Sequence, residues 1–181
     1  PVAAAYDENG DLYVTEMIDY PYKPRPGHKP LGAVRLLRDT DGDGRFDASH
    51  VFADCLLWAA GVAPWKGGVF VASPPDIWYL KDTDGDHVAD VRRKVFTGFG
   101  TENEQGMLNN LGHGIDHRIY GSTSVNGGQV RRASAPESEG VSVKGLDFRF
   151  DPNSEVLEPI SGTVQFGNTF DDYGNRFLCS E

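Results

Sequence analysis

The sequence predicts an all-β fold, and more specifically a β-propeller fragment with calcium loops between strands. Three observations lead to this prediction: turn-like clusters of glycine and proline, a strand motif that recurs along the chain, and two Asp-rich loops of the same spacing. The 22 glycines and 11 prolines among 181 residues are scattered in short clusters, which favours many short strands over long helices.

A short apolar strand motif occurs four times at spacings of 57, 50 and 58 residues. The copies are centred on Leu12, Val69, Ile119 and Phe177. Further matching segments follow the first two copies, 33–39 with 76–82 and 49–52 with 93–96. A unit of this length with three or four short strands is typical of a propeller blade with an elaborated loop.

The third unit is looser than the first two. Its expected strands are 119–123, 129–131 and 145–152, and it has no Asp-rich loop. Propellers close with roughly four to eight blades, so about three units predict an incomplete ring. We therefore interpret residues 1–181 as part of a single β-propeller domain, truncated at both ends, with a solenoid or a sandwich as the alternative.

Two loops carry the residue pattern of a calcium site, with aspartates at loop positions 1, 3, 5 and 9. The expected ligands, including the backbone carbonyl of position 7, are Asp39, Asp41, Asp43, Arg45 and Asp47 in the first loop and Asp82, Asp84, Asp86, Val88 and Asp90 in the second. Calcium takes six to eight oxygens at about 2.3–2.6 Å, and alternate residues of a tight loop can face one ion. The alternative is a solvated acidic turn.

Position 6 distinguishes the two loops, because His87 stands where the first loop has Gly44. This position makes a sharp turn that prefers glycine, although histidine tolerates left-handed backbone better than most residues, so we expect weaker binding in the second loop. Neither loop has Glu at position 12, where His50 and Arg93 stand, which argues against an EF-hand. The loops resemble the strand-to-strand calcium loops of integrin α-subunit propellers, in which position 9 closes the coordination.

Composition excludes several other classes. A formal net charge of −10 argues against nucleic acid as a partner and favours cations. Cys55 and Cys179 form no CxxC or CxxCH pattern, so the sequence has neither a zinc knuckle nor a c-type haem attachment site, and we expect both thiols to be unpaired. No apolar run approaches the roughly 18 residues of a membrane-spanning helix.

The long polar segment 96–111 is a candidate functional loop that contains Asn110 and precedes His113. His113 falls on the expected innermost strand of its blade, where side chains face the central channel. Asn110 and Asn168 occupy equivalent positions in neighbouring units. Such a ring of polar groups either binds a ligand or holds channel water.

Three stretches, 76–86, 95–110 and 165–172, together resemble the propeller of a family of membrane-bound dehydrogenase proteins of planctomycetes and verrucomicrobia. That family is similar to soluble quinoprotein glucose and sorbosone dehydrogenases. The resemblance implies a six-bladed propeller, a periplasmic or extracellular location, membrane association through other parts of the parent chain, and a cytochrome c domain there. It also implies oxidation of a sugar or polyol with pyrroloquinoline quinone (PQQ).

The sequence departs from those enzymes at one point. Their catalytic His lies just before an inner strand, whereas the corresponding stretch here, 106–110, contains no His and His113 comes later. The leading hypothesis is a calcium-binding propeller of a quinoprotein-like dehydrogenase, with His113 as base and with Asn110 and Asn168 beside it. The alternative is a non-catalytic, calcium-stabilised propeller that binds carbohydrate or protein.

Overall fold

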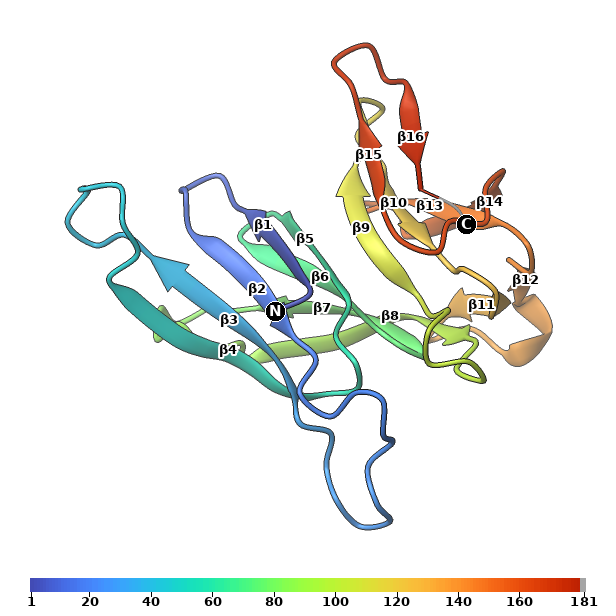
Figure 1. Cartoon of the computed structure of the whole chain (residues 1–181), viewed down its shortest axis with the longest axis horizontal. Helices are drawn as coiled ribbons and strands as arrows, with labels where there is room; N and C mark the ends of the chain where they lie inside the picture. The colour runs from blue at the N-terminus through green and yellow to red at the C-terminus, as the bar shows by residue number, and fades with distance from the viewer. Residues whose placement is uncertain (180–181) are drawn as a thin grey trace.

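In the computed structural model, residues 1–179 are described, and they form an all-β fold (Figure 1). Sixteen strands lie in four antiparallel sheets, and the helical content of this part is one 3-10 turn, η1 (Glu137–Glu139). No helix within these residues is long and apolar enough to cross a membrane. The all-β prediction is confirmed.

The first sheet is a meander in which each strand pairs with the next along the chain. Its strands are β1 (Ala3–Tyr6), β2 (Leu12–Glu16), β3 (Gly32–Arg38) and β4 (Ala48–Leu56). The repeat centred on Leu12 is therefore the second strand of this sheet.

The second sheet begins with the same meander and then gains two further strands. Its strands are β5 (Gly61–Trp65), β6 (Gly68–Ser73), β7 (Asp76–Lys81), β8 (Val91–Phe99), β11 (Gly128–Arg132) and β12 (Val141–Ser142). The order across the sheet is β12-β11-β8-β7-β6-β5.

The third sheet has the order β14-β13-β10-β9, and a two-stranded hairpin follows it. The strands of the third sheet are β9 (Asn109–His113), β10 (Ile119–Ser122), β13 (Asp147–Asp151) and β14 (Val156–Ile160), and those of the hairpin are β15 (Asn168–Phe170) and β16 (Arg176–Leu178). The four copies of the strand motif thus occupy β2, β6, β10 and β16, the second strand of each sheet.

One expected strand belongs to a different sheet. The sequence placed 129–131 in the third unit, but β11 pairs with β8 of the second sheet, with Arg131 opposite Thr97 and Arg132 opposite Phe96. The close approach depends on Gly98 and Gly128, which have positive φ and leave no room for a Cβ. The fourth strand of the third sheet is instead β14, a short edge strand that contains Pro159 and that the sequence did not reveal.

The second sheet is buried on both faces, as β6, the strand between β5 and β7, shows. All six residues of β6 are buried, and alternate side chains point in opposite directions. Val69 and Val71 join the core shared with the first sheet. Phe70 joins the core shared with the third sheet, where its ring meets Phe150 at 5.1 Å between centroids. The first and third sheets therefore pack against opposite faces of the second.

The first strands of successive sheets lie next to one another. Contacts join β1 to β5, β5 to β9, and β9 to β15. Successive sheets thus contact one another through their first strands.

Candidate calcium loops and a cavity at the strand ends

Each Asp-rich loop connects the third strand of a sheet to the fourth. Loop 1 (residues 39–47) follows β3, and loop 2 (residues 82–90) follows β7. The position of both loops between consecutive strands was predicted correctly.

The aspartates of loop 1 organise its backbone. Asp39 accepts hydrogen bonds from the backbone N–H groups of Gly42 and Gly44, at 2.7 and 2.8 Å. Asp43 accepts one from the N–H of Arg45 at 2.8 Å. The loop is therefore wound so that its carboxylates turn inward.

Loop 2 repeats the same hydrogen bonds. Asp82 accepts from the N–H groups of Gly85 and His87 at 2.7 and 2.8 Å, and Asp86 accepts from Val88 at 2.8 Å. The same bonding in two sheets means that the residue spacing, rather than the local neighbours, determines the loop conformation.

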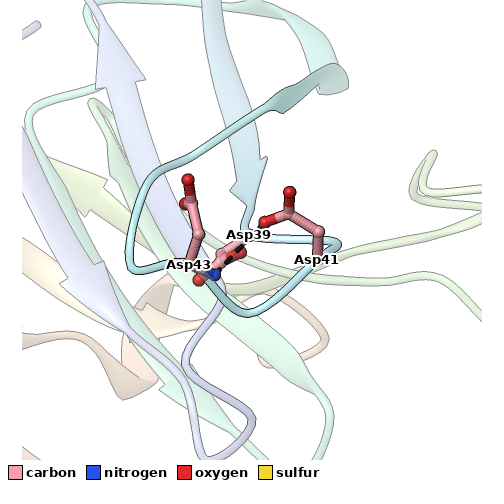
Figure 2. Close-up of side chains that lie close together, drawn as sticks. All are labelled: Asp39, Asp41 and Asp43. Carbon is pink, nitrogen blue, oxygen red and sulfur yellow. Dashed lines mark hydrogen bonds between the residues drawn. The ribbon is translucent and has the colours of Figure 1, made fainter.

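In each loop, three carboxylates lie close enough to bind a single ion. Oxygen atoms of Asp39, Asp41 and Asp43 lie within 4.8 Å of one another, and the same holds for the corresponding residues of loop 2, Asp82, Asp84 and Asp86. Figure 2 shows the three side chains of loop 1 gathered together. Two oxygens bound to one calcium ion can be no more than about 5 Å apart, twice the ligand distance, so the spacing fits this metal.

The aspartate at position 9 is engaged elsewhere in the loop. Asp47 accepts hydrogen bonds from the N–H and the hydroxyl of Thr40, and Asp90 does the same with Thr83. The aspartate at position 9 therefore stabilises the start of each loop and lies outside the group of three carboxylates. Arg45 and Val88, expected to contribute carbonyls, have exposed side chains that do not obstruct the loop.

The backbone N–H groups keep the first aspartate of each loop charged. The N–H of Gly44 is the main cause that lowers the pKa of Asp39, and that of Gly85 does the same for Asp82. For Asp47, the Thr40 hydroxyl is the main cause of a lowered pKa. Ionised carboxylates gathered in this way repel one another, and a divalent cation relieves the repulsion.

His87 adopts the backbone conformation expected for position 6. Its φ is 69°, beside 85° for Gly44 in loop 1. The imidazole contributes contacts that glycine cannot make, because its Nε2 lies 3.1 Å from Nη1 of Arg38 and its ring lies 4.6 Å from that of His50. Both of those residues belong to the first sheet.

Loop 2 is consequently attached to the preceding sheet. The N–H of Ala89 donates to the carbonyl of Phe52 on β4 at 2.7 Å, and the Ala89 side chain is buried in the core between the two sheets. The equivalent residue of loop 1, Phe46, is 40% exposed and stacks on Tyr6 of its own sheet. The sequence pattern contains no signal for this attachment, because it depends on residues about 37 positions apart.

A cavity of about 350 Å³ lies at the opposite ends of the strands. Apolar side chains, including Met17, Met107 and Phe166, form much of its wall. Its side chains with hydrogen-bonding groups are Tyr20, Glu104, Gln105, Asn109 and Asn110. The volume is within the range of small-molecule sites in proteins.

Asn109 is the best-fixed polar group of the cavity wall, and the sequence analysis missed it. Its Nδ2 donates to the carbonyls of Met107 and Gln165 at 2.7 and 3.0 Å, and its Oδ1 accepts from Nδ2 of Asn110. Asn110 has a φ of 55°, a left-handed conformation that asparagine tolerates. The pair presents a pre-arranged amide edge to the cavity.

The three candidate catalytic residues do not meet at one place. Asn110 lines the cavity, and Asn168 begins β15 two residues after the cavity residue Phe166. His113 ends β9 three residues beyond Asn110, which corresponds to roughly 10 Å along a strand.

His113 and Asn168 make contacts that stabilise the fold. His113 Nε2 is 2.9 Å from the carbonyl of Pro64, and its ring stacks on Trp65. Asn168 accepts a hydrogen bond from Arg176 at 2.7 Å. His113 does lie on the first strand of its sheet, as expected from the repeat.

The cavity does not fit PQQ. This cofactor carries three carboxylates, which require cationic partners. Among residues 1–179, no Lys, Arg or His side chain lines the cavity, and Glu104 adds a negative charge.

Cys55 and Cys179 are both free thiols, as predicted.

Comparison with known proteins gives a family match and two distant structures. The family model described as "Domain of unknown function (DUF7133)" matches residues 1–181. The calcium and iodide structures of Trichoderma reesei Carbohydrate-Active Enzymes Family AA12 are each 18% identical to this chain, with TM-scores of 0.49 and 0.48. The match covers 81% of this chain and 40% of each of those chains, so this chain spans less than half of their length. No curated protein matches the chain.

Proposed function

Because this chain belongs to the DUF7133 family, whose description assigns no activity, we propose its function from the geometry: it forms consecutive blades of a calcium-stabilised β-propeller. The observation that carries this proposal is the pair of loops with the same internal hydrogen bonds at the same point of successive sheets. In a solvated acidic turn, nothing favours three carboxylates at one point. Nothing would favour the same arrangement again in the next sheet.

The packing of the sheets supports the propeller. Blades of a propeller stack face to face, with the first strand of each blade next to the central axis. The second sheet is buried on both faces, and the strands β1, β5 and β9 contact one another in succession. The extra strands β11 and β12 extend the second blade at its outer edge.

For the parent protein we propose a quinoprotein-like dehydrogenase that acts on a sugar or polyol, with the cavity as the site of the polyhydroxy compound. Asn109, Asn110 and Gln105 can hydrogen-bond hydroxyl groups, while Met107 and Phe166 can pack against C–H faces. The quinone would need cationic residues from elsewhere in the protein. Because His113 lies away from the cavity, we assign it no chemical step here.

The non-catalytic alternative uses the same cavity and the same calcium loops. A turnover assay on the full-length protein with quinone, calcium, sugars and a dye acceptor distinguishes the dehydrogenase from the non-catalytic binding protein. Quinone-dependent turnover supports the dehydrogenase. Sugar binding without quinone binding or turnover supports the binding protein.

The calcium proposal is tested by thermal melting of the chain with increasing calcium. We expect the melting temperature to rise with calcium and to rise less in Asp41→Ala and in Asp84→Ala, with the larger loss in Asp41→Ala. Asp172→Ala is the matched control, because this exposed aspartate has no hydrogen-bond partner among the described residues. A melting temperature independent of calcium in the wild type would reduce both loops to acidic turns.

A calcium requirement of this kind suits a protein outside the cytoplasm. Extracellular modules bind calcium with dissociation constants of about 10⁻⁴–10⁻³ M, so exposed loops can stay loaded where calcium is plentiful. We therefore retain a periplasmic or extracellular location as part of the proposal.

A further inference from the structure

The connection between β2 and β3, residues 17–31, is the longest loop of the first sheet and projects from it (Figure 1). Contacts of Asp19 and Lys23 hold it in place. Oδ2 of Asp19 accepts a hydrogen bond from the N–H of Leu31 at 3.0 Å, which closes the base of the loop. Lys23 Nζ donates to the carbonyl of Thr101 at 3.2 Å and lies 5.8 Å from the ring of the buried Trp58.

This loop is a positive region on an acidic protein. It contains Lys23, Arg25 and Lys29 against the single carboxylate of Asp19, whereas the chain as a whole carries a net charge of −10. Most other arginines are neutralised, as in the pairs of Arg93 with Glu155, Arg149 with Glu158 and Arg176 with Asp147. Within residues 1–179, neither Arg25 nor Lys29 has a carboxylate partner, and both are exposed.

The loop surrounds a hollow of about 790 Å³. Its wall includes Tyr22, Arg25, His28 and Lys29, and the Tyr22 side chain is 77% exposed. Asp19 also contributes to the wall, and its carboxylate closes the base of the loop through the N–H of Leu31. The hollow therefore combines two cations without carboxylate partners among the described residues and an exposed aromatic ring.

We propose that this loop binds an acidic sugar, meaning a carbohydrate that carries carboxylate or sulfate groups; the carbohydrate part of this inference rests on the proposed function. Arg25 and Lys29 would pair with the anionic group. The Tyr22 ring would pack against the sugar ring. A sugar acid supplies both a negative charge and a ring face, whereas an inorganic anion supplies only the charge.

The position of the loop connects this site to the cavity. Met17 and Tyr20, from the same loop, line the cavity at the strand ends. An acidic polysaccharide held by Arg25 and Lys29 would thus lie beside the cavity that we assign to a sugar or polyol. Nucleic acid fits less well, because the cations are few and the rest of the chain is strongly acidic.

Calorimetric titration of the chain tests the proposal with three probes: a galacturonic acid tetramer, a neutral glucose tetramer of equal length, and inorganic phosphate. We expect the acidic tetramer to bind at least about tenfold more tightly than the neutral tetramer and than phosphate. The preference should weaken as salt is added. The double variant Arg25→Gln with Lys29→Gln should remove the preference, and Tyr22→Ala should weaken the acidic tetramer more than phosphate.

Lys144→Gln is the matched control, because Lys144 is an exposed cation without an ion pair in the described residues. Equal binding of acidic and neutral tetramers would overturn the proposal. Equal binding of the acidic tetramer and phosphate, or an equal loss in Lys144→Gln, would also overturn it by showing a general effect of charge. Calcium-dependent melting of the same samples reports separately on the proposed propeller.

Discussion

Arg176 on β16 donates a hydrogen bond from Nη2 to Oδ2 of Asp147 on β13 at 2.7 Å, and the Asp147 side chain is completely buried. The same guanidinium donates to Oδ1 of Asn168 and to the carbonyl of Ser161. Burial raises the pKa of Asp147, and the hydrogen bond from Arg176 acts in the opposite direction. This ion pair fastens the β15–β16 hairpin to the third sheet.

Removal of the arginine should destabilise the protein strongly. In Arg176→Met the buried carboxylate loses its counter-charge, and we expect the free energy of unfolding to fall by about 3 kcal/mol or more. The double variant Arg176→Met with Asp147→Asn should lose less, because no buried charge remains. Urea denaturation measures both. The control Arg35→Met breaks the more exposed pair with Glu16 and should cost about 1 kcal/mol or less; equal losses in the two arginine variants would contradict the prediction.

His87→Gly should increase the calcium affinity of loop 2. A non-glycine residue in the left-handed conformation costs about 1–2 kcal/mol, and an ion that fixes the loop in this conformation must oppose that cost. Calorimetric titration in an Asp41→Ala background isolates loop 2, and we expect an increase of roughly fivefold to tenfold in affinity. The reciprocal change, Gly44→His, should weaken loop 1. Unchanged affinity in both variants would show that position 6 does not limit binding.

Calcium in loop 2 should protect the first sheet from hydrogen exchange. The N–H of Ala89 donates to Phe52 on β4, so a loop fixed by calcium holds that strand more firmly. Mass spectrometry of exchange should show slower exchange in β4 when calcium is added to the wild type and no slowing in Asp84→Ala. The strand β14 serves as the internal reference. Equal protection of β4 and β14 would indicate a global effect instead.

Truncation of one aromatic ring between the second and third sheets should be costly. Phe150 is fully buried and lies 5.1 Å from both Phe70 and Phe96 between ring centroids. We expect Phe150→Ala to lower the free energy of unfolding by about 3–5 kcal/mol. Tyr173→Ala, which removes a ring that is 88% exposed, should change it by no more than about 0.5 kcal/mol. Denaturant midpoints for the two variants provide the comparison.

The sequence was most informative where structure depends on nearby residues. The Asp-rich loops could be located because aspartate side chains bond to N–H groups two to five positions away, so the residue spacing itself encodes the fold of the loop. The second strand of each sheet was recognisable for a related reason, since the same apolar motif recurs there. Its central residue is buried in β6 and β10, as Val69 and Ile119, whereas Phe177 of β16 is exposed.

Features that depend on distant residues could not be predicted in the same way. The pairing of β11 with β8 joins segments separated by a whole hairpin, and a strand pattern does not name its partner. The separation of His113 from the cavity has a similar cause. The repeat placed this residue on the correct strand, but the cavity forms where Asn109 and Asn110 begin that strand.

A third-to-fourth connection can also be attached to the sheet before it without an aspartate cluster. In the third sheet the short turn after Asp151 is held by Arg93 on β8, which pairs with Glu155, and by Arg132 on β11, which donates to the Glu155 carbonyl. Loop 2 is held to β4 in the equivalent position. In both cases, a connection in one sheet contacts the sheet formed by residues earlier in the sequence.

This direction matters while the polypeptide is being synthesised. The first sheet leaves the ribosome before Ala89, so the carbonyl of Phe52 gains its partner only when β5, β6 and β7 of the second sheet have followed. A completed sheet thus gains its last stabilising contact only after part of the next sheet has been synthesised. A nascent chain arrested between residues 56 and 89 would expose the apolar face of β4 and its neighbours, and would be a natural substrate for chaperones.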